Sequence, residues 1–221
     1  MTGEDIRRAR QERWATKVGS EACWFITEPT LELARELRER SAADGEIALD
    51  IGCGPGSITA HLARSFAVAV GVDVALGAVT QARVRGAEER HPPVFAVAEA
   101  PRLPFSDGTF SLIFDRGVIQ HVPGPEWPRY FAEVTRLLRP GGRYLQYWPQ
   151  RRPPPMTTAA GWRTRGAKLL GRRPAPGPAM RQSAPKDLVV EEIRVFPFTA
   201  ANGKDFDFTF GLFTKVGQRA P

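Results

Sequence analysis

Three glycines spaced two residues apart constrain this chain more than any other feature. Gly52, Gly54 and Gly56 follow the apolar run Ile47–Ile51, which has the length and pattern of a buried strand. After the glycines, residues 57–66 repeat apolar side chains at the spacing of a helix with one buried face. This order predicts a glycine turn at the carboxyl end of a strand. Glycine tolerates positive φ and has no Cβ, so such a turn lets a ligand approach the backbone.

The spacing of the glycines differs from that of dinucleotide-binding proteins. Their fingerprint has glycines at the first, third and sixth positions, whereas here they stand at the first, third and fifth, with Pro55 between the last two. A second apolar run, residues 68–72, ends in Asp73, which lies 23 residues after Asp50. An acid at this distance reaches ribose hydroxyls in nucleotide-binding folds. The pattern indicates a ribose-containing ligand other than NAD.

The turn Asp50–Gly56 and the strand end at Asp73 resemble those of class I S-adenosylmethionine-dependent methyltransferases. A glycine triplet alone also occurs in ordinary turns, but further features of the family follow in order along the chain. In this family the same elements bind the methionine part and the ribose of the cofactor. The resemblance implies S-adenosylmethionine as the cofactor and the following binding residues: Asp50, Gly52, Cys53, Gly54, Gly56, Asp73 and Val74.

Two later segments carry the same resemblance. Residues 99–105 are similar to an acid-Ala-x-x-Leu-Pro-Phe segment that faces the adenine in the family, with Glu99 where Asp is commoner. There a carboxylate accepts from the adenine amino group, and the amide of Ala100 is expected to donate to the ring. Residues 137–142, Leu-Leu-Arg-Pro-Gly-Gly, are a second hallmark, although structurally they are only a helix stop and a turn.

The alternation of apolar strands and amphipathic helices predicts an α/β fold. Further strands are expected at 94–98, 110–114, 143–148, 189–198 and 206–216, and helices at 75–90 and 125–138. The Asn-Gly pair at 202–203 is a strong hairpin signal between the last two strands. The resemblance implies a doubly wound, seven-stranded, mainly parallel sheet with an antiparallel last strand.

The length of 221 residues and the apolar content of 42% suit one domain. Within it we expect four parts: an N-terminal helical lid over 1–45, a cofactor-binding core over 46–148, a basic, proline-rich insertion over 149–187, and a C-terminal β-hairpin over 188–218. The composition predicts that the insertion is mobile, because seven prolines lie between Pro153 and Pro185 and few large apolar residues accompany them.

The net charge of +7 is a local excess. Residues 151–186 contain nine Lys or Arg and no acidic residue, which leaves 22 basic and 24 acidic residues elsewhere. Of the 31 basic residues 26 are Arg, so a codon bias explains the excess as well as an anionic partner does. An RNA or tRNA methyltransferase that uses this segment therefore remains an alternative. If the acceptor is a small molecule, no nucleic-acid partner is expected.

The segment after the fourth strand is expected to be the reaction edge, since ligands of open α/β sheets lie beyond the carboxyl ends of the strands. Asp115 is taken as the first residue there, beside cofactor and substrate. Its Asp-Arg-Gly sequence followed by His121 resembles small thiol-, thiopurine- and tellurite-type methyltransferases. His121 is the candidate base, because histidine ordinarily titrates near neutral pH, and Arg116 is the candidate partner of a thiolate. The alternatives are a structural histidine and an arginine in a surface ion pair.

Four aromatic side chains are expected to line the acceptor pocket, with ordinary core packing as the alternative. They are Trp14, Trp24, Phe25 and Trp148.

We expect a methyl transfer to a small molecule, with a thiol preferred over a hydroxyl. A thiol is partly ionised at neutral pH and needs alignment more than deprotonation, whereas an alcohol needs a strong base. A protein that binds S-adenosylmethionine without transferring the methyl group is a further alternative. Cys23, Cys53 and the histidines show no metal-ligand spacing, so no metal is expected, and a catalytic thiol is the less favoured role for Cys53. The absence of a long apolar run and of a signal pattern predicts a cytoplasmic location.

Overall fold

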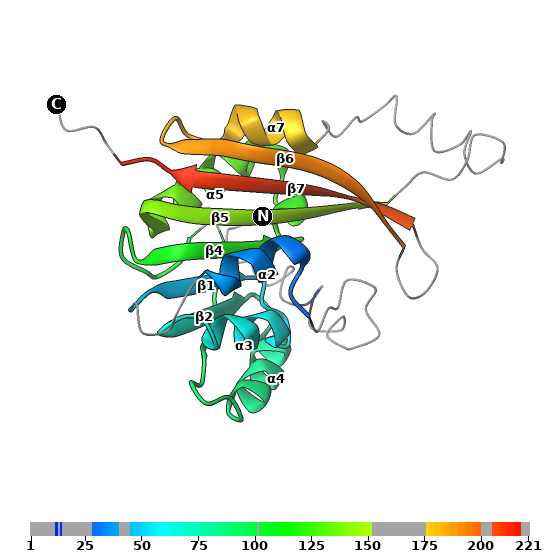
Figure 1. Cartoon of the computed structure of the whole chain (residues 1–221). Coiled ribbons are helices and arrows are strands. Elements are labelled where there is room, and N and C mark those ends of the chain that lie inside the picture. Colours follow the sequence, from blue (N-terminus) through cyan, green and yellow to red (C-terminus); the bar gives the residue numbers. More distant parts are fainter. Residues whose placement is uncertain are drawn as a thin grey trace, which may run out of the picture.

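The computed structural model describes residues 12, 14, 28–39, 45–100, 102–151, 176–199 and 205–217 (Figure 1). Its helices are α2 (Leu31–Arg38), α3 (Ser57–Ala63), α4 (Leu76–Gly86), α5 (Trp127–Leu137) and α7 (Pro176–Ser183). Its strands are β1 (Ile47–Ile51), β2 (Val68–Asp73), β3 (Val94–Val97), β4 (Phe110–Arg116), β5 (Leu138–Arg151), β6 (Leu188–Thr199) and β7 (Asp205–Lys215). All seven predicted strands are present, and their order along the chain is as expected.

The seven strands form one sheet in the order β3-β2-β1-β4-β5-β7-β6. Strand β7 runs antiparallel to both of its neighbours, and the other pairs are parallel. The predicted doubly wound sheet with an antiparallel last strand is therefore confirmed. The strand order reverses between β1 and β4, and in open α/β sheets this is the place where ligands bind.

The sheet is covered by helices on both faces (Figure 1). Helices α2, α3 and α4 pack on one face, and α5 and α7 pack on the other. Strand β4 lies in the middle and is buried along almost its whole length. Burial on both faces explains why its sequence is a nearly continuous apolar run rather than an alternating one.

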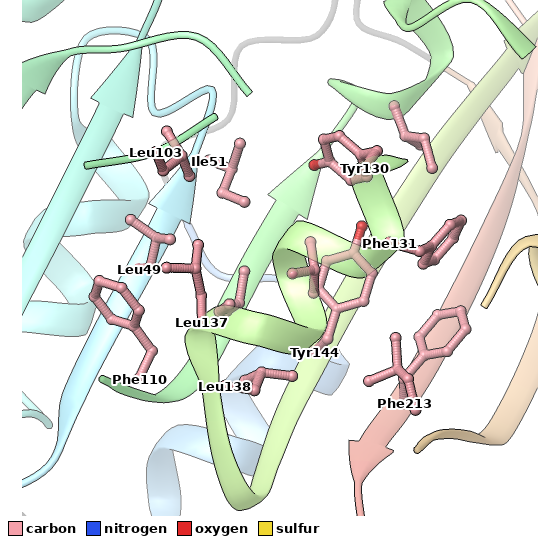
Figure 2. Close-up of a cluster of buried hydrophobic side chains, with 14 of the residues drawn as sticks. Leu49, Ile51, Leu103, Phe110, Tyr130, Phe131, Leu137, Leu138, Tyr144 and Phe213 are labelled. Carbon is pink, nitrogen blue, oxygen red and sulfur yellow. The ribbon is translucent and has the colours of Figure 1, made fainter. Parts of the chain in front are cut away.

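The core under α5 and α7 is rich in aromatic side chains (Figure 2). Phe131 of α5 packs edge-on against Tyr144 of β5, with ring centroids 6.2 Å apart, and Phe213 of β7 lies 5.3 Å from Tyr144. Figure 2 shows Tyr130 and Tyr144 as the labelled side chains of this cluster that carry an oxygen. Buried tyrosine hydroxyls need hydrogen-bond partners, and these partners determine part of the site described below.

Two helices are shorter than their sequence patterns predict. Helix α4 ends at Gly86 instead of residue 90. The backbone of Gly86 packs so closely on Pro93 and Phe95 that a Cβ there would lie 2.8 Å from the Phe95 ring. The expected helix 125–138 begins with the 3₁₀ turn Gly124–Glu126 and is α-helical only over Trp127–Leu137. In both helices the central turns were predicted and the ends were not.

The predicted insertion contains a regular element. Helix α7 occupies Pro176–Ser183, and its Met180 is fully buried in the aromatic core. Proline is tolerated in the first turn of a helix because those N–H groups have no partner within the helix. The proline-rich composition of this segment gave no sign of the helix, and the mobility of the segment stays a prediction.

Several predictions lie outside the described residues. These are most of the N-terminal lid, including Trp24 and Phe25, the basic stretch 152–175, and the Asn-Gly turn between β6 and β7. The hairpin itself is present, since Thr199 pairs with Asp205. None of the helices that the structure describes has the length and apolar character needed to cross a membrane.

Candidate cofactor and acceptor site

The glycine turn connects the carboxyl end of β1 to α3. Gly52, Gly54 and Gly56 have φ values of 72°, 54° and 81°, a region that other residues rarely adopt. The amides of Gly52 and Cys53 both donate to the carbonyl of Val72, at 2.8 and 3.0 Å, so the turn is attached to the end of β2. The predicted turn is confirmed, and its backbone conformation explains the choice of glycine.

The three glycines do not serve the same purpose. A Cβ on Gly52 would lie 2.2 Å from Cγ2 of Val118, and one on Gly56 would lie 2.9 Å from the side chains of Ala82 and Phe95. At Gly54 no heavy atom of the described residues lies within 4 Å of that position. Gly52 and Gly56 therefore allow close internal packing. Gly54 is the glycine whose backbone is open to a ligand.

Asp73 lies beside Gly54 at the end of β2. Its Oδ2 accepts from the amide of Gly54 at 2.9 Å, and its Oδ1 accepts from the amide of Ala75 at 2.8 Å. Burial raises the pKa of Asp73, and the backbone donors act in the opposite direction. Each carboxylate oxygen retains capacity for a second hydrogen bond, which suits a ribose hydroxyl. Val74, the next residue, is half-buried at the same strand end.

Asp50 lies below the turn, within β1. Its Oδ2 accepts from the Thr59 hydroxyl of α3 at 2.7 Å. Burial, helped by the nearby carboxylates of Asp73 and Asp115, raises the pKa of Asp50 to about 7, although the hydrogen bond from Thr59 acts in the opposite direction. Three acids thus lie near one edge of the sheet, and their combined charge favours a cationic ligand.

Cys53 is a packing residue. Its side chain is buried among Val79, Ala82 and Phe95, and burial raises the pKa of the thiol well above its ordinary value. A thiol in such surroundings stays protonated and is a poor nucleophile. Only its backbone is suited to contact a ligand.

Glu99 and Ala100 lie just beyond β3, next to Asp73. The amide of Ala98 donates to the carbonyl of Asp73 at 3.0 Å, which attaches this segment to the end of β2. Glu99 forms an isolated bridge with Arg102, and both Glu99 and Ala100 are half-buried. The segment predicted to face adenine therefore lies beside the residue predicted to hold the ribose.

Asp115 requires a correction. Strand β4 continues through Arg116, so Asp115 is not the first residue beyond the strand, and its side chain is 0% exposed. Its Oδ2 accepts from the hydroxyls of Tyr130 at 2.7 Å and Tyr144 at 3.2 Å, and its Oδ1 accepts from the amide of Val118 at 2.8 Å. Both oxygens accept hydrogen bonds from within the fold. This arrangement does not place the Asp115 side chain in direct contact with a substrate or cofactor.

Asp115 instead holds the loop that follows β4. The amide of Val118 is attached to Asp115, and the Val118 side chain packs on Gly52 of the glycine turn. The amide of Gly117 donates to the carbonyl of Tyr147 at 2.9 Å. Burial raises the pKa of Asp115 to about 6, although the hydrogen bonds from Tyr130, Val118 and Tyr144 act in the opposite direction. A buried carboxylate thus links α5, β5 and the loop to the cofactor turn.

Comparisons with known proteins agree with this geometry. Residues 48–142 match the family model described as a methyltransferase domain. Over 103 residues the chain is 34% identical to phosphoethanolamine N-methyltransferase 2 of Caenorhabditis elegans, a match that covers 46% of this chain and 23% of that protein. Residues 48–142 therefore resemble a methyltransferase domain, and the sheet has the strand order expected from the resemblance to class I S-adenosylmethionine-dependent methyltransferases.

Two solved structures share the fold of this chain. One, from work on the conversion of a disulfide bond into a thioacetal group during echinomycin biosynthesis, has a TM-score of 0.69 and 20% identity, and the match covers 95% of this chain and 94% of that one. The other is geranyl diphosphate C-methyltransferase from Streptomyces coelicolor with S-adenosylhomocysteine, with a TM-score of 0.62 and 17% identity over 84% and 77% of the two chains. The chain spans less than half the length of the curated relatives it matches.

The structure brings two predicted site residues together. The rings of Trp14 and His121 meet edge-on with centroids 4.7 Å apart. His121 is exposed, and its Nε2 lies 3.1 Å from Nε2 of Gln120. Trp14 belongs to the predicted lid, so this contact places a lid residue on the loop that Asp115 holds.

Two other predicted residues have different surroundings from those expected. The guanidinium of Arg116 lies over the ring of Phe208, 5.3 Å from its centroid, as in a cation–π contact. Trp148 is 4% exposed and packs edge-on against Trp127 at 4.9 Å. It packs in the core under α5, which differs from its expected place in the wall of a pocket.

Sequence reasoning missed four residues of this site: Val118, Tyr130, Tyr144 and Gln146. The first three occupy apolar positions of a loop, a helix and a strand, and such positions carry no sign of a role beyond packing. Gln146 is a polar residue inside a buried strand, and this was a usable signal, because buried polar side chains require partners.

Proposed function

We propose that this chain transfers a methyl group from S-adenosylmethionine to a small-molecule acceptor. The observation that carries the proposal is Gly54, whose backbone is open at the carboxyl end of β1 and attached to the Asp73 carboxylate. It lies inside the stretch that matches the methyltransferase domain model. The names of similar proteins that act on phosphoethanolamine and geranyl diphosphate support a small acceptor over RNA.

The binding residues fall into three groups along the strand ends. The methionine part of the cofactor is assigned to Asp50 and to the turn from Gly52 to Gly56, the ribose to Asp73 and Val74, and the adenine to Glu99 and Ala100. The Asp50 carboxylate suits this assignment because it adds negative charge opposite a cationic group. The geometry described above supports direct contacts with the cofactor for two residues. Gly54 would contact it through its backbone, and Asp73 through its side chain.

The bound cofactor supplies an activated methyl group on a positively charged sulfur. The protein therefore has to align the acceptor and exclude water rather than form a covalent intermediate. In our proposal Asp115 acts through the loop, as a positioning residue that holds Val118 against the cofactor turn. His121 and the aromatic ring of Trp14 then lie at the outer end of that loop, where an acceptor would enter.

We infer that a thiol is a better acceptor than an aliphatic hydroxyl. Among the described residues of the loop, His121 is the single side chain suited to remove a proton near neutral pH, and a thiol needs such help least. The neighbour studied for thioacetal formation is a precedent for sulfur chemistry on this fold. Arg116 is proposed to favour the thiolate by its charge, although its guanidinium also packs on Phe208.

Calorimetry with S-adenosylmethionine and S-adenosylhomocysteine tests the cofactor proposal. Both are expected to bind and to raise the melting temperature. At a ligand concentration one hundred times the Kd, the free energy of unfolding should rise by about 2.7 kcal/mol. Absence of binding by both would refute the proposed function. RNA binding that weakens steeply with salt would instead favour the RNA methyltransferase alternative.

Competition between acceptors tests the preference for sulfur. An aryl thiol, a phenol and an aliphatic alcohol are incubated together with the enzyme, and their methylated products are quantified by mass spectrometry at pH 7. The thiol product is expected to dominate. Domination by the oxygen product would refute the sulfur preference, whereas cofactor binding without any product would favour a binding protein without transferase activity.

A further inference from the structure

Gln146 is a buried polar side chain without a partner. It lies on β5 and is 0% exposed, and neither its amide oxygen nor its amide nitrogen has a hydrogen-bond partner among the residues that the structure describes. Leaving a buried amide unsatisfied costs free energy, since its hydrogen bonds to water are lost and not replaced. A fold retains such a group when something outside the fold completes its hydrogen bonds, or when an internal water does.

The position of Gln146 in the sheet connects it to the reaction edge. It is paired in register with Asp115 on β4, and Asp115 is paired with Ile51, the last residue of β1 before the glycine turn. Gln146 therefore belongs to the last row of side chains below the turn. Because side chains alternate along a strand, it faces the same side as Tyr144 and Trp148, toward α5 and α7.

The neighbours of Gln146 cannot complete its hydrogen bonds. Asp115 already accepts from Val118, Tyr130 and Tyr144. The register partner of Gln146 on β7 is Gly211, which has no side chain. A Cβ on Gly211 would meet the Phe213 ring at 2.7 Å, so this side offers only apolar atoms. Neither the Asp115 carboxylate nor the Gly211 side of the sheet therefore provides a hydrogen-bond partner for the Gln146 amide.

We propose that Gln146 recognises the methyl acceptor, a role that rests on the proposed function because that function places the acceptor at this edge. The acceptor class is an uncharged small molecule that carries a carboxamide or lactam on an apolar body. A carboxamide has one donor and one acceptor in the arrangement that pairs with the Gln146 amide. A charged group is disfavoured at this depth, and the hydrophobic core on this face of β5 favours an apolar body.

The test uses benzamide as the probe and acetophenone, which lacks the amide donor, as its control. The side-chain NH₂ signals of Gln146 are followed by ¹H–¹⁵N NMR in the S-adenosylhomocysteine complex, with assignment from the Gln146→Met variant. Benzamide is expected to shift these signals and acetophenone to shift them much less. Gln146→Met should weaken benzamide binding at least tenfold and keep or raise the melting temperature, because it removes an unpaired amide at similar volume.

The matched control is Gln81→Met on the exposed surface of α4, which should change neither benzamide binding nor melting temperature. Two results overturn the inference. One is Gln146 signals that benzamide leaves unmoved, and the other is benzamide binding that Gln146→Met leaves unchanged. A lower melting temperature of Gln146→Met together with unmoved signals would identify an internal water as the partner of the amide. Calorimetry with S-adenosylhomocysteine on the same samples separates this failure from a failure of the proposed function.

Discussion

The two sides of the sheet, which we call the cofactor half (β1 to β3) and the acceptor half (β5 to β7) after the roles proposed above, are held together in different ways. Around the glycine turn the close contacts involve backbone and small side chains, such as Gly56 against Ala82 and the Gly54 amide on Asp73. In the acceptor half the contacts are between large rings: Tyr147 lies 5.0 Å from Phe210, and Phe196 stacks on Phe208 at 6.0 Å.

Ion pairs and hydrogen bonds attach α2 to the acceptor half of the sheet. Glu32 of α2 accepts from the Tyr147 hydroxyl at 2.7 Å and from Arg194 of β6 at 2.8 Å. One turn later Glu36 pairs with Arg143, which also reaches Glu191 at 3.1 Å. Contacts made by side chains can be exchanged for others of similar size, whereas a turn at positive φ accepts glycine almost alone. The cofactor half is therefore the more constrained of the two, and the acceptor half has more freedom to vary with substrate.

The largest effect is expected for Gly56→Ala in the cofactor half. The new Cβ would lie 2.9 Å from Ala82 and Phe95 and force a strained φ, so the free energy of unfolding should fall by about 2–4 kcal/mol. Urea denaturation measures this change. The control is Gly77→Ala in α4, where no described atom lies within 4 Å and alanine suits a helix better. Equal stability of the two variants would contradict the constraint that packing and backbone conformation place on the glycine turn.

Asp73→Ala should weaken cofactor binding by about 1–3 kcal/mol, which corresponds to roughly 5- to 150-fold in Kd. It removes both the proposed ribose contact and the acceptor of the Gly54 amide. Asp73→Asn retains one acceptor oxygen and should lose less. Titration calorimetry with S-adenosylhomocysteine measures the affinities, with Glu88→Ala in the exposed turn after α4 as the control. Unchanged affinity of Asp73→Ala would refute the ribose assignment.

Tyr130→Phe should reduce stability by about 1–2 kcal/mol at pH 8, because the Asp115 carboxylate loses a hydrogen-bond donor. The pKa of Asp115 in the folded state is about 6, above its ordinary value of 3.8, so the folded protein binds this proton more tightly than the unfolded chain. Protonation therefore stabilises the fold, and this contribution is lost as the pH rises from about 4 to about 6.

Removal of the Tyr130 donor should raise the pKa of Asp115 further. The stability deficit of Tyr130→Phe should consequently be smaller at pH 5 than at pH 8, as measured by urea denaturation at both values. In an Asp115→Asn background, which has no carboxyl to titrate, the deficit should not change with pH. A deficit of equal size at both pH values in the wild-type background would show that the hydroxyl acts only through packing.

The smallest effect is expected for Arg194→Met in the acceptor half. Its guanidinium is 44% exposed, pairs with Glu32 and lies over Phe210, 5.4 Å from the ring centroid. Exposed pairs of this kind contribute about 0–1 kcal/mol and weaken with salt. A double-mutant cycle with Glu32→Gln at low and high salt measures the coupling. A coupling energy above about 2 kcal/mol would mean that this ion pair stabilises the attachment of α2 about as strongly as the backbone conformation of Gly56 stabilises the glycine turn.

The sequence by itself determined the cofactor half. A run of strand residues followed by glycines at positive φ, and an acid at the end of the next strand, are local patterns whose geometry follows from the residue types. The order of the strands along the chain, the glycine turn and the place of Asp73 were predicted for this reason. The helix ends at Gly86 and Leu137 were less predictable, because they depend on what the last turns pack against.

Only the tertiary structure decided what lies below the reaction edge. Asp115, Tyr130 and Tyr144 come from three different elements, and their hydrogen bonds exist because β4, β5 and α5 meet in one core. The sequence showed an acid beyond a strand and placed it in the site, whereas packing turns its side chain into the interior. Trp148 was misplaced for the same reason. Which face a side chain takes, and what satisfies it there, depends on long-range contacts that no local pattern records.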